Sequence, residues 1–395
     1  MYIRLLENTE KYEAGKIAAF CFHARVSDEE AERKKTEYLN NRDEQWGAFT
    51  DDGALMGSII NNHFTARLCG QNVICGGIGA VSTLPEYRCR GAIRGIFGEL
   101  LKAARERGEV ISLLYPFSHE FYRKFGYESA VTGTCYETEP AVLKRFMFDG
   151  QAKMWQPGEP VTPFTELYNQ WADQWHLAFR RTDEQMNGQQ MDRKPLRDRR
   201  FCWLLKPKDG DKPFAYVIAD DIYHDPAAIM NVNEAAWTNA EGFRAVLGFL
   251  GRFGADYGTI RFTNMPTGID LAALSGNAYG VRTIPNRSHM LRVMNTEALL
   301  RIMCRERGSA FTIMVNGDSQ IAENNGTFRV NGNDVTVAED AEPDMICDIR
   351  ALARMACGDA EMTEILLRPD VRVNGDISEI QKVFFRRSVY IGDHF

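Results

Sequence analysis

The chain has 395 residues, of which 44% are hydrophobic and 26% are charged, and its formal net charge is −7. A chain of this length exceeds what one hydrophobic core organises, so two or three domains are expected. The acidic balance argues against a general nucleic-acid-binding protein, which needs a basic face, and permits a cleft that attracts a cationic substrate.

Neither membrane insertion nor metal chemistry is indicated by the sequence. No segment approaches the roughly 20 apolar residues of a membrane span, and charged residues follow Met1 too closely for a secretion signal. Nine scattered cysteines without a CxxC pair favour a reducing compartment, so a cytoplasmic protein is expected. His119-Glu120 begins like a zinc-binding helix, but Arg123 stands where the second histidine belongs. We therefore expect no bound metal.

Hydrophobic periodicity and turn residues predict alternating strands and helices over residues 1–150. The Asp51-Asp52-Gly53 turn joins two of these strands as a hairpin. Strands are predicted at 2–6, 45–49, 55–64, 73–84 and 110–115, and helices at 9–22, 28–39, 91–107 and 119–125. The expected result is an α/β unit, a mixed sheet with helices on both faces.

Two further units are predicted beyond the Gln156-Pro157-Gly158 break. The second repeats the strand-helix-strand order of the first, with strands at 214–219, 227–231 and 259–262 and a helix at 240–254. The third begins after Asn286, with strands at 290–294, 310–315, 326–330 and 334–337, helices at 296–305 and 348–357, and a tail at 377–395. The predicted domains are therefore 1–150, 151–286 and 287–395.

The segment from Gly79 to Arg94 runs out of a strand, through a turn with a proline, into a helix that begins at Arg88-x-x-Gly91. The first N–H groups of a helix have no partner and stand at the positive end of its dipole, so they bind a pyrophosphate well. Gly91 lets the backbone approach such an anion, and the neighbouring arginines add charge. The alternative is a capped helix with a solvated basic first turn, although basic residues there oppose the dipole.

About thirty residues later the chain reads Phe121-Tyr122-Arg123-Lys124-Phe125-Gly126-Tyr127-Glu128. Together with the RxxG helix start, this segment resembles the GNAT superfamily. More specifically, the chain resembles the enhanced intracellular survival (Eis) family of N-acetyltransferases. The resemblance implies tandem GNAT-like domains, the second degenerate, followed by a sterol-carrier-protein-like (SCP2-like) domain. It also implies acetyl-CoA as co-substrate and a homo-oligomer, a hexamer in that family.

Carried over by position, the resemblance implies a set of contacts to acetyl-CoA. They are Val81, Thr83, Arg88, Cys89, Gly91, Ala92 and Ser118. The superfamily often has Gly or Ala two residues after the conserved glycine, whereas this chain has Ile93. That difference suggests an altered approach to the cofactor but leaves the pyrophosphate contacts intact.

The resemblance also implies catalytic roles for two residues. Tyr122 matches the general acid that protonates the departing thiolate, whereas the alternative is a core aromatic packed beside Phe121 and Phe125. The terminal carboxylate, here that of Phe395, matches the base that removes the amine proton, although final residues of a chain are usually frayed. If the terminus has no such role, Glu120 or His119 becomes the candidate base.

Three functions compete at this point. The first is acetylation of amines on cationic small molecules, aminoglycoside-like or polyamine-like, or of lysine side chains. The second is lipid or sterol carriage by the C-terminal domain, and the third is acyl-CoA binding without turnover. The sequence does not identify the acceptor amine.

Overall fold

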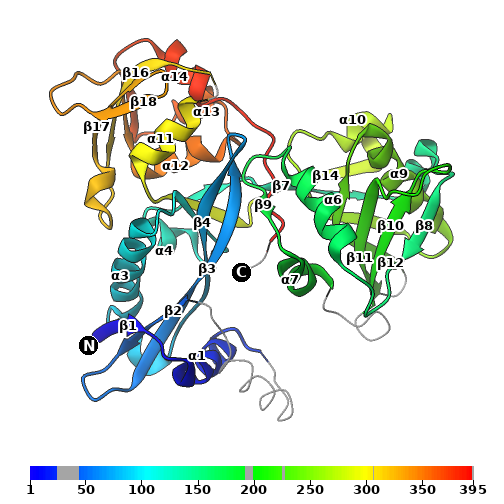
Figure 1. The fold of residues 1–395 in the computed structure, drawn as a ribbon, viewed down its shortest axis with the longest axis horizontal. Helices are drawn as coiled ribbons and strands as arrows, with labels where there is room; N and C mark the ends of the chain where they lie inside the picture. The colour runs from blue at the N-terminus through cyan, green and yellow to red at the C-terminus, as the bar shows by residue number, and fades with distance from the viewer. Residues whose placement is uncertain (25–43, 192–198, 225–226, 306, 394–395) are drawn as a thin grey trace.

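The computed structural model describes residues 1–24, 44–191, 199–224, 227–305 and 307–393. These residues form three mixed β-sheets with packed helices, and this α/β architecture confirms the predicted fold class. Figure 1 shows three lobes, with the first sheet below the unit of the third sheet and the unit of the second sheet to one side. The helix predicted at 28–39 lies entirely outside the described residues.

The first sheet combines strands from the N-terminal third of the chain with two that come from later segments. In pairing order its strands are β1 (Tyr2–Leu5), β2 (Glu44–Phe49), β3 (Leu55–Leu68), β4 (Gln71–Thr83), β5 (Ile111–Leu114), β15 (His289–Val293) and β6 (Glu128–Ala130), with β9 (Phe179–Arg180) paired to β3. Its helices are α1 (Asn8–Cys21), α3 (Ala92–Glu106) and α4 (His119–Arg123). Helix α3 buries Ile96, Phe97, Leu100 and Leu101 on one face, the spacing of an amphipathic helix.

Strand exchange links the first sheet to the second. Strand β15 lies antiparallel between β5 and β6, with Met290 opposite Leu114 on one side and Ser129 on the other. In the other direction β7 (Gly133–Thr138) enters the second sheet, between β13 (Thr259–Met265) and β14 (Val281–Asn286). The sheets therefore cross the domain limits predicted at 150 and 286. All five residues of β15 are buried, so it reads as a core strand, but its sequence cannot tell which sheet it joins.

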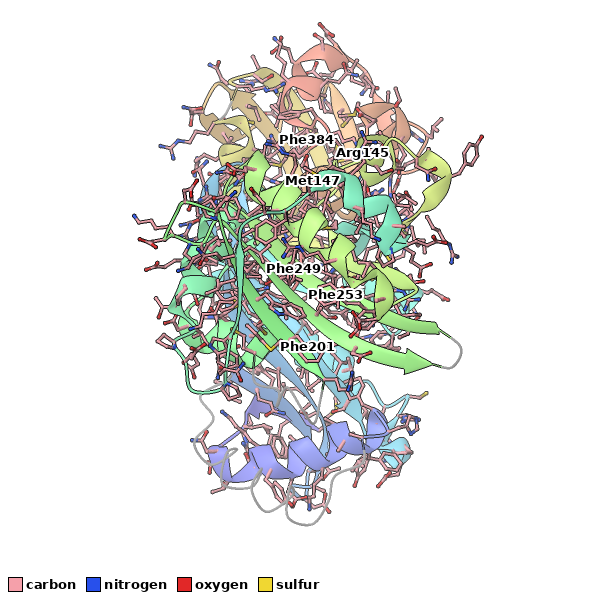
Figure 2. The ribbon with its side chains drawn as sticks, turned by 90° about the vertical axis from the view of Figure 1, so that its right-hand side faces the viewer. Arg145, Met147, Phe201, Phe249, Phe253 and Phe384 are labelled. Atoms are coloured by element: carbon pink, nitrogen blue, oxygen red, sulfur yellow. The ribbon has the colours of Figure 1, made fainter. Side chains whose placement is uncertain are left out.

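The second sheet runs in the order β14, β7, β13, β12 (Ala227–Trp237), β11 (Ala215–His224), β10 (Arg200–Lys206) and β8 (Gln151–Met154). Its helices are α5 (Pro140–Leu143), α6 (Thr162–Ala172), α7 (Asp183–Met186), α9 (Ala240–Leu250) and α10 (Leu271–Ser275). Phe249 of α9 packs edge-to-face on Phe253 and on Trp203 of β10, as Figure 2 shows for the two phenylalanines. These rings hold the helix on the sheet.

The third sheet shares its core with the first. Its strands, in pairing order, are β18 (Asp334–Val337), β17 (Gly326–Asn331), β16 (Ala310–Asn316), β19 (Met345–Asp348) and β20 (Val371–Val373). Its helices are α11 (Thr296–Cys304), α12 (Ile349–Cys357), α13 (Met362–Ile365) and α14 (Ile377–Val383). Every residue of α12 except Arg350 is buried, because the helix packs on β15 and β6 as well as on its own sheet. One apolar cluster accordingly includes Leu113, Leu291 and Leu352.

The elements predicted for residues 1–150 are present wherever the structure describes them, with ends that differ by at most four residues. Strands β6 and β9, of three and two residues, are too short to be predicted, and β7 also escaped prediction although it has six residues. Within the described residues no helix is long and apolar enough to cross a membrane. The same residues contain no cluster of three side chains suited to a metal ion.

Candidate active site

Strand β4 departs from regular pairing at Ala80 and Val81. Ser82 pairs with Ser58 and Gly79 pairs with Ile60, so Ala80 and Val81 together stand opposite the single residue Ile59. Ala80 has a φ of 51°, a left-handed conformation that residues other than glycine rarely adopt. The parallel pairing of β4 with β5 stops at Ile78, although β4 continues to Thr83. The two strands thus separate beside the bulge, and the backbone at Val81 leaves the regular ladder.

The start of α3 is built to leave backbone N–H groups free. Gly91 is the N-cap with a φ of 83°, and no side chain caps the helix or places an acidic group in its first turn. The first helical bond runs from the Gly95 N–H to the Gly91 carbonyl at 2.9 Å, so the N–H groups of Ala92 and Ile93 have no acceptor within the helix. A Cβ added to Gly91 would meet no atom within 4 Å, which places this position at open space.

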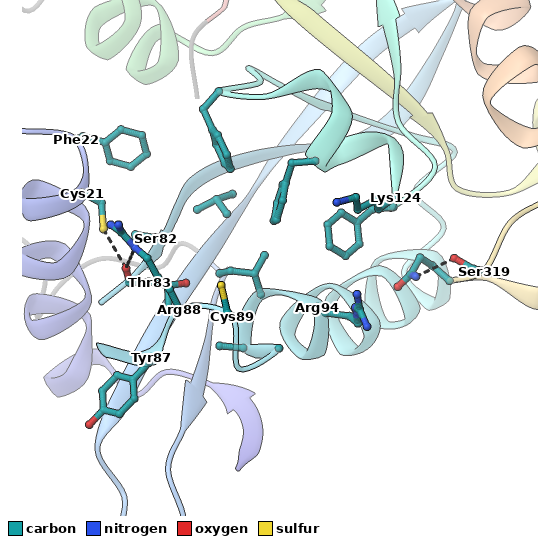
Figure 3. A pocket seen from close by; sticks show the side chains of 18 residues that line it. Cys21, Phe22, Ser82, Thr83, Tyr87, Arg88, Cys89, Arg94, Lys124 and Ser319 are labelled. Carbon is teal, nitrogen blue, oxygen red and sulfur yellow. Dashed lines mark hydrogen bonds between the residues drawn. The ribbon is translucent and has the colours of Figure 1, made fainter. Parts of the chain in front are cut away.

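A cavity of about 1010 Å³ lies over this helix start and the end of β4 (Figure 3). Helix α1 contributes Cys21 and Phe22 at one end, while Lys124 and Ser319 lie at the other. The complete lining is Cys21, Phe22, Val81, Ser82, Thr83, Tyr87, Arg88, Cys89, Gly91, Ala92, Ile93, Arg94, Phe117, Phe121, Lys124, Phe125, Ser319 and Gln320. The walls are therefore partly aromatic and partly polar.

The charge in this lining has one sign. Arg88, Arg94 and Lys124 are cations, and no acidic side chain is among the lining residues that the structure describes. Arg88 donates from Nε to the Thr83 carbonyl at 3.4 Å, and the described residues supply no carboxylate partner to any of the three. Three cations beside uncapped helical N–H groups form a site for a polyanion.

Six of the seven residues expected to contact the cofactor line this one cavity; they are Val81, Thr83, Arg88, Cys89, Gly91 and Ala92. Ser118 is not in the lining. It is the N-cap of α4, where its Oγ accepts a hydrogen bond from the Phe121 N–H at 3.3 Å. Ser118 therefore has a structural role as a helix cap, and its contact with the cofactor stays a prediction.

Tyr122 does not line the cavity but packs against two aromatic rings that do, those of Phe117 and Phe121. Its side chain is 2% exposed and meets the rings of Phe121 and Phe117 edge-on, each with centroids 5.2 Å away. Burial raises the pKa of Tyr122 above its usual range, so the phenol keeps its proton at every working pH. His119 and Glu120, on the same helix, are exposed.

Phe395, the second residue expected to take part in catalysis, lies outside the described residues. The tail that leads to it is firmly held up to Asp393. The Ile391 N–H donates to the Thr132 carbonyl at 3.0 Å, and the Asp393 carboxylate pairs with Arg181 at 2.6 Å with both side chains buried. Burial chiefly, and the Asp393 carboxylate in addition, raises the pKa of Tyr115, the residue that follows β5. Thr132 also bonds to His289 at 2.8 Å, and the His289 ring packs on that of Tyr115. The tail is therefore linked to the residue that follows β5 through two side-chain contacts.

Comparison with known proteins matches this arrangement to a family. Residues 2–130 fit the model of the acetyltransferase (GNAT) domain, and residues 297–392 fit that of the sterol carrier protein domain. Residues 2–130 form a GNAT acetyltransferase domain. The C-terminal match confirms the predicted SCP2-like domain, and no curated protein sequence matches the chain significantly.

Solved structures share the architecture over the whole chain. One is a GCN5-related N-acetyltransferase from Anabaena variabilis, with 20% identity, a TM-score of 0.83 and full coverage of both chains. A probable N-acyltransferase from Enterococcus faecalis has 19% identity and a TM-score of 0.84 over 100% of this chain and 99% of its own. Eis1 from Mycobacterium abscessus has 19% identity and a TM-score of 0.82, with full coverage of both. At these identities the likeness establishes a common fold.

Sequence reasoning missed several residues around the cavity of the GNAT domain. Phe121 and Phe125 of the aromatic wall stand in the quoted motif, where only a core role is expected of them, and Phe117 lies just before that motif. Ser319 and Gln320 belong to the sterol-carrier-like domain, about two hundred residues downstream of the RxxG helix. No spacing in the sequence could have placed them at this site.

Proposed function

We propose that the chain is an acetyl-CoA-dependent N-acetyltransferase and that the cavity over α3 holds acetyl-CoA. The observation that carries this proposal is one cavity that joins an uncapped, cation-flanked helix start to Val81, on the part of β4 that no longer pairs with β5. In this proposal the N–H groups of Ala92 and Ile93, with Arg88, hold the pyrophosphate. The pantetheine arm then extends along β4 toward Val81.

In the reaction, the acceptor nitrogen attacks the thioester carbonyl carbon, the C–S bond breaks, and the products are an acetamide and the free thiol. The bulge in β4 takes Val81 out of the regular strand pairing. Its N–H is the proposed donor to the carbonyl oxygen, which becomes negatively charged during the attack. The buried phenol of Tyr122 is the proposed donor of a proton to the departing sulfur. Burial raises the pKa of this phenol, which keeps it protonated until the thiolate forms but also makes it a weaker acid toward that thiolate.

We further propose that the carboxylate of Phe395 removes the proton from the attacking amine. Support comes from the tail, because Asp393, two residues upstream, is held in a buried ion pair with Arg181. The acceptor is proposed to be a cationic amine, aminoglycoside-like, polyamine-like or a lysine side chain, in keeping with the net charge of −7. Likeness in fold to Eis1 is consistent with this class. Hexameric assembly stays a prediction from the resemblance, and cytoplasmic location stays a prediction from the cysteine usage of the sequence.

Acetyl-CoA binding and thiol release with an amine panel test the proposal. Gly91→Glu should weaken acetyl-CoA binding by more than tenfold in calorimetry, since it introduces negative charge where the pyrophosphate is proposed to lie. Gly70→Glu is a matched control, because Gly70 also has a positive φ of 73° and open space around it but lies at the far end of β4. If the folded Gly91→Glu and Gly70→Glu variants bind acetyl-CoA equally well, the cofactor does not bind at the start of α3. Binding without turnover of any amine would favour an acyl-CoA-binding protein instead.

A further inference from the structure

The C-terminal domain sends one loop to the cavity of the GNAT domain. The loop follows β16, and its Ser319 and Gln320 line the cavity beside Lys124 and Arg94. Figure 3 shows Arg94, Lys124 and Ser319 together at one end, with Cys21 and Phe22 of α1 at the other. A domain that shares no sequence motif with the N-terminal unit thus contributes polar groups to its site.

A buried ion pair holds this loop in position. Asp318 forms a bidentate contact with Arg292 of β15, 2.8 Å at each oxygen, and both side chains are fully buried. The same carboxylate accepts hydrogen bonds from the N–H groups of Gln320 and Ile321 at 2.9 and 3.0 Å. Arg292 also donates to the Phe125 carbonyl, in the turn that follows α4. The loop is therefore fixed to the segment that carries Lys124 and Phe125.

A second contact fixes the loop to α3. Arg105 donates to the Asn324 Oδ1 at 2.9 Å and to the Met294 carbonyl at 2.7 Å. Since Arg94 lies on the same helix, its distance from the loop is set by a rigid element. Ser319 and Gln320 are consequently held at the cavity in the absence of any ligand.

The chemistry of this end of the cavity suits a phosphate monoester with adjacent hydroxyl groups. Arg94 and Lys124 provide charge, and the described residues give neither of them a carboxylate partner. Ser319 and Gln320 provide hydroxyl and amide groups that donate or accept. Neither carboxylate of the loop lines the cavity, since Asp318 is paired with Arg292 and Glu323 is exposed in the short helix that follows.

We infer that the Ser319-Gln320 loop of the C-terminal domain, with Arg94 and Lys124, binds the phosphorylated ribose of coenzyme A. This inference rests on the proposed function, which already assigns the pyrophosphate to the start of α3. A pyrophosphate held at Gly91 leaves two directions for the rest of the molecule. The pantetheine arm takes the direction of Val81 and α1, and the 3′-phosphorylated ribose takes the direction of Arg94 and Ser319.

The test compares acetyl-CoA with acetyl-dephospho-CoA, which lacks only the 3′-phosphate, by calorimetry on the full-length protein. The wild type should bind acetyl-CoA about tenfold or more tightly than the dephospho form, the scale of one or two charge-assisted hydrogen bonds. Arg94→Gln and the double variant Ser319→Ala/Gln320→Ala should each lose most of that preference. Lys102→Gln, which removes a charge from an exposed position of the same helix outside the cavity, should retain it.

Each outcome has a distinct meaning. A wild type without preference, or a loop variant that keeps the full preference, overturns this inference while leaving acetyl-CoA binding at Gly91 intact. A wild type that binds neither compound, or binding that survives Gly91→Glu unchanged, overturns the proposed function itself. Variants are compared at equal folded fraction, measured by circular dichroism, so that a loss of preference is not a loss of fold.

Discussion

His176 joins the three units at the point where the tail enters, and its protonation should loosen the junction. Its Nε2 bonds to the Ala356 carbonyl of α12 at 2.9 Å, and its Nδ1 accepts from the Cys69 N–H between β3 and β4 at 3.3 Å. Its backbone pairs with the tail, through the Ser388 carbonyl and the Tyr390 N–H. A second proton on this ring would turn Nδ1 into a donor, so that it would face the Cys69 N–H and the hydrogen bond between them would be lost.

The size of the effect follows from the pKa. Burial, with a smaller contribution from the Arg387 charge, lowers the pKa of His176 from 6.5 to about 4. His176 therefore becomes protonated near pH 6.5 in the unfolded chain but only near pH 4 in the folded protein. The contribution of neutral His176 to the free energy of unfolding is complete above pH 6.5 and is lost as the pH falls toward 4. The loss is about 3 kcal/mol in all and about 2 kcal/mol between pH 7 and pH 5.

The assay is urea unfolding of the wild type and of His176→Gln between pH 7 and pH 4.5. Glutamine keeps one donor and one acceptor but does not titrate. The difference in free energy of unfolding between the two proteins cancels the other titrating groups, so the wild type should lose about 2 kcal/mol relative to the variant at pH 5. A difference that stays constant over this range would refute the reasoning.

Three other perturbations test the site. Tyr122→Phe should lower kcat by on the order of 10²-fold with little change in stability. Tyr127→Phe removes a buried hydrogen bond of 2.9 Å to Ser112, so it should lose about 1 kcal/mol of stability and keep its turnover. The reverse pattern in thiol-release and unfolding assays would contradict the assignment. Deleting Phe395 or extending the chain beyond it should abolish turnover but not acetyl-CoA binding, and an N-terminal extension should be harmless; an active C-terminal extension removes the terminal carboxylate from the mechanism. Gly126→Ala should cost about 1–3 kcal/mol more than Gly108→Ala, because both positions have a positive φ but only the first would drive a Cβ into Arg292; equal unfolding free energies would refute it.

The N-terminal site could be predicted from the sequence because its elements are local. A strand, a proline-bearing turn and the Arg88-x-x-Gly91 helix start are consecutive in the chain, and α4 follows within thirty residues. The left-handed conformation of Gly91 is one that glycine adopts readily, and no Ser, Thr, Asp or Asn directly precedes the helix to cap it. Six of the seven predicted cofactor contacts accordingly line one cavity.

What escaped prediction depends on long-range packing. The apolar strand that contains Arg292 has no feature that distinguishes the first sheet from the third, and its place between β5 and β6 is decided by tertiary contacts. Likewise Asp318 reads as a residue of a polar loop. Its role appears only when Arg292 is seen to be buried without any other carboxylate at its guanidinium among the described residues.

These long-range contacts bear on what the sterol-carrier-like domain does in this chain. Its helix α12 packs on β15 and β6, its loop fixes Asp318 to Arg292, and its tail is held by Thr132 and Arg181 before the chain ends. A domain that carried lipid independently would need to open. Opening here would expose α12 and break the buried Arg292–Asp318 pair. Losing one partner of such a buried pair costs about 3–5 kcal/mol. The same contacts bring a polar loop to the cavity of the GNAT domain and anchor the tail at Thr132 and Arg181, outside that domain. The C-terminal domain is thus better explained as part of the acetyltransferase site than as a separate carrier.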